Sequence, residues 1–430
     1  MHFDQGNIQE RGHQVKIMGR IYENAKMVRM WLGDNDRDDA FEMIKNIDEA
    51  FGTWPTDEGE KWSKWLTTVS PFVDENHQLS SPEWNRYQDL IRRPWFSRVW
   101  VLQEIGLASM ATVIRMYKSF NKEYAVTFLK IIYEARNHQA AGPRDKVFAL
   151  LAHLSAQKNL QEKTIAQADY TKSTLEVYQE LAEAFLRAPR HHLELLSAVE
   201  HLPRVDFDQL NGFPSWVPRW DLGGQSTVLG EPEFGHFKTA LNKEPKVTIL
   251  GSDGVIRIEG ILFDHVARYS GPIDINDFLD PQRALVNRLW ESYGSTDFST
   301  AYTTGELLVE AFHRTLSSDG RTYAYSDEHE YVSTYRLKNH QNFIRYWSNR
   351  SEKPETPDLP ESEQEKRRYF TSIEAIDDGN EEDFQKAAQI VCHGRKFFVT
   401  KKGYFGVGPL CMKENDLVCV LYGGQVPFLL

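Results

Sequence analysis

Residues 93–108 restrict the fold of this chain more than any other stretch. After Ser97 the stretch is apolar on nearly every face, and it carries a single acid, Glu104. A helix that is apolar all round has to be buried, because a surface helix keeps a polar face for water. Pro94 suits the first turn of a helix, and Ser97 suits an N-cap. We therefore predict a buried helix from Ser97 to Ala108.

The acid within this apolar helix has two explanations. Burial makes the charged form of a carboxyl group costly unless a cation or a hydrogen-bond donor pairs with it. Glu104 is then either a structural acid, matched by Arg98 or Arg144, or a group held for chemistry. Trp100 lies four residues earlier and so shares a helix face with Glu104. The residues alone leave both explanations open.

Helices and strands alternate along the first 120 residues. Residues 7–25 have apolar side chains at helical spacing, and residues 27–32 form a short apolar run that ends at a glycine. A second helix is predicted at residues 39–50 and a second strand at residues 111–117. This alternation is typical of an α/β layer. Only two good strands precede residue 120, so the predicted layer looks incomplete at its N-terminus.

The chain then becomes helical. A Gly-Pro-Arg-Asp turn at residues 142–145 predicts a helix that runs to about Leu154, with Asp145 as its N-cap. Residues 174–187 again have helical spacing. Residues 213–220 are rich in proline and tryptophan, so we expect an extended arm whose rings fill a core.

The C-terminal part is predicted to be an antiparallel β module. Two β-branched runs at residues 247–250 and 255–260 flank an Asp-Gly turn, which favours a hairpin. Further strands near the C-terminus suggest a small barrel or sandwich, interrupted by a helical insertion at residues 275–350. Residues 351–383 carry 12 acids and 4 bases, so we predict a disordered loop. The expected parts are a partial α/β domain at 1–155, a helical region at 156–245 and the β module at 246–430, which makes the fold mixed α+β overall.

Composition narrows the classes of partner. The net charge of −12 argues against binding to nucleic acid or to anionic membranes. No apolar run reaches the ~18–20 residues of a membrane span. The three cysteines, Cys392, Cys411 and Cys419, form no paired pattern, so we expect reduced thiols in a cytoplasmic protein. No histidine has the spacing of a metal ligand, and we predict no metal.

Short motifs along nearly the whole chain resemble those of fungal heterokaryon-incompatibility (HET) domain proteins. The motifs, in chain order, are Glu10-Arg11-Gly12-His13-Gln14-Val15, Val28 with Trp31-Leu32-Gly33, the block from Trp95 to Glu104, Pro143-Arg144-Asp145-Lys146-Val147, Asp169-Tyr170, Pro214-Ser215-Trp216-Val217-Pro218, Gly260 with Asp264, Gly406 with Gly408-Pro409, and Gly423-Gly424 with Val426-Pro427-Phe428. Their order and number carry the resemblance. It implies a role in vegetative incompatibility and programmed cell death. The family pattern has further strands before the segment that begins here, so the resemblance also implies an N-terminally truncated domain.

HET domains are in turn similar to Toll/interleukin-1 receptor (TIR) domains. In the TIR domains that cleave NAD, a glutamate lies on a helix in a Ser/Trp-x-x-x-Glu setting, which Ser97, Trp100 and Glu104 fit. This resemblance implies an NAD glycohydrolase in which NAD is the substrate and no cofactor is bound. Glu104 would orient the ribose and stabilise an oxocarbenium-like transition state. The supporting candidates are Ser97, Arg98, Trp100, Arg144 and Asp145.

Two other functions stay open. The HET fold could serve as a non-catalytic signalling or recognition module, which binds a second copy of itself or an incompatibility partner. The chain could also be an inactive fragment. On either alternative Arg144 and Asp145 would cap and pin a helix. The three cysteines have no nearby histidine and aspartate arrangement, so we do not expect a nucleophile among them.

Overall fold

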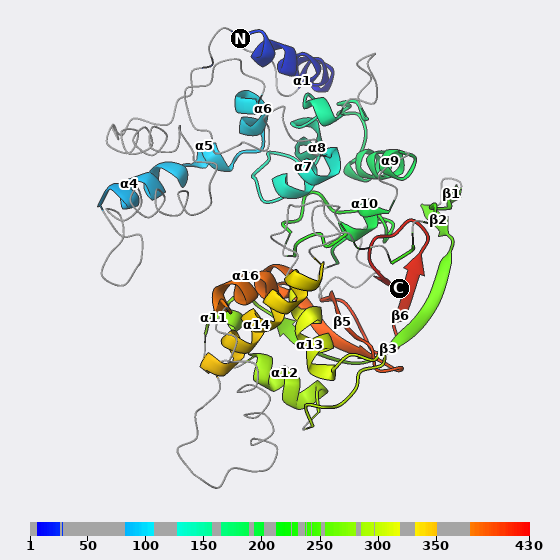
Figure 1. The fold of residues 1–430 in the computed structure, drawn as a ribbon. Helices are drawn as coiled ribbons and strands as arrows, with labels where there is room; N and C mark the ends of the chain where they lie inside the picture. The colour runs from blue at the N-terminus through cyan, green and yellow to red at the C-terminus, as the bar shows by residue number, and fades with distance from the viewer. Residues whose placement is uncertain are drawn as a thin grey trace. The chain divides into compact units, whose positions relative to one another are not determined.

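The structure is a computed structural model, and Figure 1 shows its ribbon. It describes residues 7–25, 28, 82–106, 127–156, 165–188, 193–201, 212–224, 226–230, 237, 239–241, 243–250, 254–280, 285–295, 297–318, 332–350 and 379–430. The chain forms two compact units. The first contains Met1–Val177 and Trp220–Gly223, and the second contains Tyr178–Arg219 and Gly224–Leu430. The predicted boundaries near residues 155 and 245 stay a prediction.

The first unit is helical over its described residues. Helix α1 (Ile8–Glu23) begins after Asn7, whose side chain accepts hydrogen bonds from the amides of Gln9 and Glu10. This confirms the predicted helix at residues 7–25. The later elements are α4 (Pro82–Ile91), α5 (Pro94–Ser97), α6 (Trp100–Gly106), α7 (Phe128–Ala135), α8 (Asp145–Phe148), the 3-10 turn Leu154–Ala156 and α9 (Thr174–Leu186). The boundary between the two units in the sequence falls within α9, after Val177.

The predicted continuous helix at residues 97–108 is wrong, because the chain breaks between α5 and α6. The Ser97 hydroxyl does not cap a helix but donates to the carbonyl of Pro94 at 2.8 Å. The amide of Gln139 donates to the carbonyl of Ser97 at 2.5 Å, and the carbonyl of Gln139 accepts from the amide of Val99 at 2.8 Å. These two bonds occupy backbone groups that a continuous helix would pair internally.

The predicted helix from Asp145 to Leu154 is also wrong. Helix α8 lasts a single turn, and its N-cap is Arg144 rather than Asp145. The Asp145 carboxylate instead accepts from the amide of Gly142, on the preceding turn, at 3.2 Å. An N-cap side chain accepts from amides further along its own helix, whereas this carboxylate accepts from residues outside α8. The strands predicted at residues 27–32, apart from Val28, and at residues 111–117 lie outside the described residues, as does the helix at residues 39–50.

The second unit contains two antiparallel sheets. Strands β1 (Val247–Leu250) and β2 (Val255–Ile258) pair with each other, which confirms the predicted hairpin. The other sheet has the order β5-β4-β3-β6-β7 and resembles half a barrel, which confirms an antiparallel β module in a mixed α+β fold. The hairpin does not join this sheet. Its strands are β3 (Gly260–Ile273), β4 (Arg395–Thr400), β5 (Phe405–Pro409), β6 (Leu417–Leu421) and β7 (Phe428–Leu429).

Strand β3 is the centre of the larger sheet (Figure 1). Its first half, from Gly260 to His265, pairs with β6. Its second half, from Val266 to Ile273, pairs with β4 on the opposite edge. Strand β3 therefore joins the β4–β5 pair to the β6–β7 pair, and all four of these strands follow the helical insertion.

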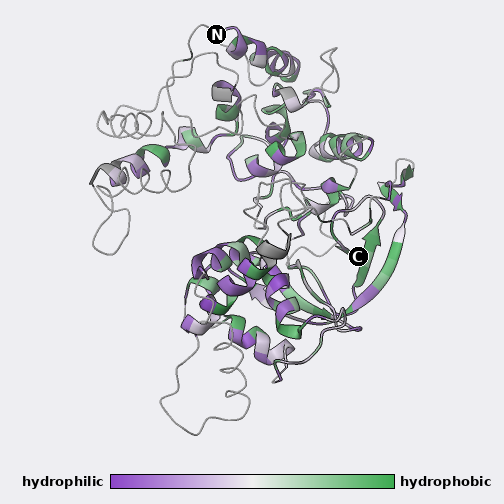
Figure 2. Cartoon of the chain, in the orientation of Figure 1, coloured by the Kyte–Doolittle hydropathy of each residue, from purple (hydrophilic) through white to green (hydrophobic). Residues whose placement is uncertain are grey.

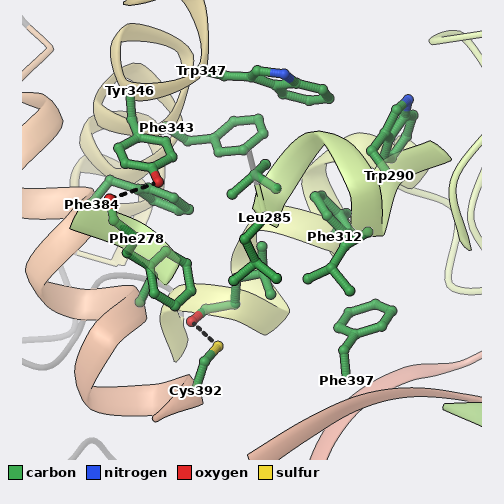
Figure 3. Packing of buried hydrophobic residues seen from close by; sticks show 14 of the residues in the cluster. Phe278, Leu285, Trp290, Phe312, Phe343, Tyr346, Trp347, Phe384, Cys392 and Phe397 are labelled. Carbon is green, nitrogen blue, oxygen red and sulfur yellow. Dashed lines mark hydrogen bonds between the residues drawn. The ribbon is translucent and has the colours of Figure 1, made fainter. Parts of the chain in front are cut away.

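Helices cover one face of this sheet and enclose an aromatic core. They are α11 (Asn276–Leu279), α12 (Leu285–Tyr293), α13 (Leu308–Ser317), α14 (Val332–Arg350) and α16 (Glu381–Cys392), and the short α10 (Glu194–Ser197) lies earlier in the chain. Figure 2 shows hydrophobic and hydrophilic residues on different faces of these helices and a hydrophobic β6. Figure 3 shows the core, whose large side chains include Phe278, Trp290, Phe312, Phe343, Trp347, Phe384 and Phe397.

Two other predictions can be compared with this unit. Most of the acidic stretch lies outside the described residues, but its end is ordered, so the loop prediction is wrong there. The Asn380 side chain accepts from the amide of Glu382 at 3.0 Å and caps α16. The proline- and tryptophan-rich segment contains no regular element, as predicted. Trp216 is buried there, and its indole N–H donates to the carbonyl of Gly254 at 2.6 Å.

Candidate functional site

The candidate site is built on one face of α1. Arg11, Val15, Met18 and Tyr22 recur at the spacing that places side chains on the same side of a helix. Arg11 lies near one end and Tyr22 near the other, about 16 Å apart along the axis at 1.5 Å per residue. Arg11 contacts Asp145, and Tyr22 contacts Glu104. Both acids selected from the sequence are therefore held by α1, in two separate centres.

The first centre surrounds Asp145, whose side chain is 1% exposed. Nη2 of Arg11 lies 3.0 Å from Oδ2 and 3.2 Å from Oδ1 of this carboxylate. The hydroxyl of Tyr170 donates to Oδ1 at 2.5 Å, and the amide of Gly142 donates to Oδ2. A buried carboxylate needs such donors to stay charged. Three protein donors satisfy it here, so this centre acts as an internal clamp between α1, α8 and the Tyr170 turn.

Tyr170 contributes to the clamp with its ring as well as its hydroxyl. The guanidinium carbon of Arg11 lies 4.0 Å from the centre of the ring, within cation–π range. Phe148 meets the same ring edge-on at 5.0 Å. Burial raises the pKa of Tyr170, and the hydrogen bond and charge of Asp145 add to the effect. The phenol is therefore a hydrogen-bond donor at neutral pH.

The residues on either side of Asp145 hold two further segments. Nη1 of Arg144 donates to the carbonyls of Tyr170 and Lys172 at 2.7 and 2.6 Å. Nζ of Lys146 donates to the carbonyl of Arg136 at 2.8 Å, and also to that of His138. Burial lowers the pKa of Lys146. Three consecutive charged residues thus tie three segments to the single turn of α8.

The second centre surrounds Glu104 on α6. Its side chain is half-buried, whereas the sequence predicted a deeply buried acid. The phenol of Tyr22 is hydrogen-bonded to Glu104, and the pKa of Tyr22 is raised to about 12 by burial first and then by the charge and hydrogen bond of Glu104. Arg98, which is exposed, acts in the opposite direction on that pKa. Arg144, the other cation predicted as a possible partner of Glu104, instead binds the carbonyls of Tyr170 and Lys172.

The motif that suggested NAD chemistry is divided in the structure. Trp100 and Glu104 lie one turn apart on α6, but Ser97 belongs to α5 and bonds to Pro94. The deeply buried polar residue of α6 is Gln103, which is 5% exposed. Its amide oxygen meets no hydrogen-bond donor among the residues that the structure describes.

Sequence reasoning missed the roles of several partners at both centres. Arg11, Lys146 and Tyr170 lie within the family motifs, but the motifs give them no role, and Tyr22 has no predicted role either. The periodicity of residues 7–25 could have placed Arg11 and Tyr22 on one face. Nothing in the spacing could have indicated which distant acid each of them contacts.

Other chemistries have little support in the described parts of the chain. No group of three or more histidine, cysteine, aspartate or glutamate side chains is placed there to hold a metal ion. None of the helices described has both the length and the apolar character that crossing a membrane requires. Burial raises the pKa of Cys392 to about 12 and also raises those of Cys411 and Cys419, so these thiols are poor nucleophiles at neutral pH.

Comparisons with known proteins bear on both units. The model of the family described as Heterokaryon incompatibility protein (HET) matches residues 3–104. The model described as Het-6 beta-barrel domain matches residues 286–430. The chain is 20% identical to Heterokaryon incompatibility protein 6, OR allele, of Neurospora crassa, over an alignment of 538 positions that covers 99% of this chain and 76% of that protein. No solved structure matches the chain.

The matched segments can be compared with the structural units. The first match ends at Glu104, yet the Asp145 clamp joins α1, inside the match, to residues well beyond it. The second match begins within α12 and contains β4 to β7, but not the central strand β3. Each structural unit therefore depends on residues outside the segment that its family model covers.

Proposed function

We propose that this chain, which combines a HET domain with a Het-6 beta-barrel domain, acts in fungal heterokaryon incompatibility as a non-catalytic recognition protein. Its partner would be another protein in the cytoplasm, either a second copy or the product of an incompatible allele. The observation that carries this proposal is that most of the candidate side chains already make hydrogen bonds or ion pairs within the fold.

Catalytic groups have to reach a substrate or its reacting atoms. Asp145 is 1% exposed and holds three protein donors. Arg144 binds two backbone carbonyls, and Ser97 binds a third. Such contacts fix the relative positions of helices, which a recognition surface needs. They do not leave these side chains available to a small-molecule substrate.

The test introduces the gene into two Neurospora crassa strains, one with the OR allele of the relative and one with a different allele at that locus. We expect fewer viable transformants in one strain than in the other. The Glu104→Gln variant should behave as the unmodified chain does. Equal recovery in both strains would remove the incompatibility proposal, and loss of the difference in the Glu104→Gln variant would overturn the non-catalytic mechanism.

The second candidate function is hydrolysis of NAD through Glu104. One observation favours it: Glu104 is half-buried rather than enclosed, its partner is the phenol of Tyr22, and Trp100 shares its helix. In this reaction the bond from the ribose carbon to nicotinamide breaks, and nicotinamide leaves with the electron pair. Water then bonds to the ribose carbon and releases a proton. A nearby carboxylate would offset the positive charge that develops on the ribose.

Nicotinamide release by the purified chain tests this second function. The informative variant is Glu104→Gln, which keeps the size of the side chain and removes its charge. The matched control is Glu23→Gln, since Glu23 is an exposed acid in the last turn of α1. Release that is lost only in Glu104→Gln supports catalysis. No release from the unmodified chain excludes it, and equal release from all three proteins excludes Glu104 as the catalytic group.

A further inference from the structure

Two histidines form a pair in the second unit, one of them buried and the other half-buried. Nε2 of His313 on α13 lies 2.8 Å from Nδ1 of His340 on α14. His313 is 1% exposed, and its ring stacks on Phe343 with the ring centres 4.8 Å apart. This pair lies beside the aromatic core, in which Phe343 also contacts Phe384 of α16. The two rings thus form a polar contact between α13 and α14 beside this apolar core.

The neighbouring side chains determine how hydrogens are placed in the pair. Asn339 has its amide nitrogen 3.4 Å from Nδ1 of His313 and 2.9 Å from the hydroxyl of Ser317. The Ser317 hydroxyl in turn donates to the carbonyl of His313 at 2.9 Å. Since Asn339 donates to Nδ1, the proton of His313 lies on Nε2 and is donated to His340. Both rings are then neutral, with one hydrogen between them.

An added proton has no good position in this arrangement. On Nδ1 of His340 it would face the N–H of His313, with two donors at hydrogen-bond distance. On Nδ1 of His313 it would face the amide group of Asn339. Either site also places a positive charge next to the buried core, where desolvation is costly. The pair is therefore compatible with neutral rings alone.

Several described charged groups on the surrounding elements are cations or are already paired. On α13, Arg314 lowers the pKa of His313 further and is paired with Glu306 at 3.4 Å. On α14, Lys338 and Arg345 are also cationic. The first turn of α16 carries three acids, Glu381, Glu382 and Asp383, of which one is paired with α14 and one within the helix. Those contacts are Glu381 with Arg350 and Glu382 with Lys386.

We propose that the His313–His340 pair is an acid-sensitive contact that holds α14 against α13 while both rings are neutral and releases it when the pair takes up a proton. This device is independent of the proposed recognition and NAD functions. Because α13 packs against β5 and α14 packs against α16, release would loosen the helical cover of the half-barrel sheet. The second unit would then expose part of its aromatic core at acidic pH.

The direction of the pH effect follows from the two pKa values. Burial lowers the pKa of His340 to about 4, and burial followed by the neighbouring ring lowers that of His313 well below 6.5. The open chain therefore binds protons first as the pH falls below about 6.5. Closure is fully favoured above that pH and is progressively lost toward pH 4. The opening equilibrium should rise by about tenfold per pH unit for each histidine that takes up a proton.

Hydrogen exchange measured by mass spectrometry on the full chain tests the proposal. Protection of peptides from α13 and α14 is compared between pH 7.5 and pH 5.0 after correction for intrinsic exchange rates. The informative variant combines His313→Gln with His340→Asn, because these amides preserve the donor and acceptor but cannot titrate. The control is His393→Gln, which removes a partly exposed histidine that lies 3.9 Å from Asp274.

We expect the unmodified chain and the His393→Gln control to lose protection in α13 and α14 as the pH falls. The double variant should show at least tenfold less change. The same pH dependence in all three proteins, or none in the unmodified chain, would overturn the proposal. If the double variant does not fold, exchange at the imidazole C2–H of the unmodified chain gives the pKa of each ring. Ordinary values near 6.5 for both rings would also overturn it.

Discussion

The Asp145 clamp leads to a quantitative prediction about α1. Replacing Asp145 with Asn keeps the shape of the side chain but removes the charge that pairs with Arg11. The side chain of Asp145 is 1% exposed, and that of Arg11 is 31% exposed. Breaking a fully buried ion pair costs about 3–5 kcal/mol. Water can partly rehydrate Arg11, and the amide oxygen of Asn still accepts one hydrogen bond, so we expect a loss of about 2 kcal/mol.

Local hydrogen exchange is the appropriate assay, because a chain with two units need not unfold in one step. A loss of about 2 kcal/mol corresponds to roughly 30-fold faster exchange of the α1 amides, at 1.4 kcal/mol per factor of ten. The control is Asp169→Asn, which alters the acid next to Tyr170 in the sequence. Its carboxylate accepts hydrogen bonds from the amide and the hydroxyl of Thr171. Unchanged exchange of α1 in Asp145→Asn would refute the clamp. So would an equal change in both variants.

Two further predictions concern the second unit. Asn380→Ala removes the N-cap of α16 and should cost about 1 kcal/mol, measured as faster exchange of the Glu382 amide; an unchanged rate would contradict the cap. Gly423→Ala should lower the thermal unfolding midpoint by several degrees, since Gly423 has φ +90° and an added Cβ would lie 2.5 Å from Cβ of Pro245. The control is Gly271→Ala, where an added Cβ meets nothing within 4 Å, and an equal loss in both would contradict this reasoning.

The sequence predicted correctly those elements that depend on residues close together in the chain. The helical spacing of residues 7–25, the Asp-Gly hairpin and the C-terminal strands are confirmed because periodicity and turn residues determine such elements. Asn7 and Asn380 cap their helices as short polar residues usually do.

Contacts between residues far apart in the sequence explain the predictions that were wrong. Residues 97–108 look like one helix, but Gln139 takes the backbone groups at the break between α5 and α6. Asp145 looks like an N-cap, but Arg11 and Tyr170 direct its carboxylate elsewhere. Burial of Glu104 was overestimated because Gln103 faces inward on the short α6 in its place. In each case the competing partner lies far away in the sequence.

The position of β3 has a consequence for how the protein is made. A ribosome releases β3 long before β4 and β6, the two strands that pair with its edges. Until those strands emerge, β3 lacks the partners of both its edges in the nascent chain. Non-local pairing of this kind is slow and leaves intermediates open to aggregation. Assembly of the sheet therefore waits until β4 and β6 have been synthesised, and a fragment restricted to residues 286–430 would lack the strand around which the sheet assembles.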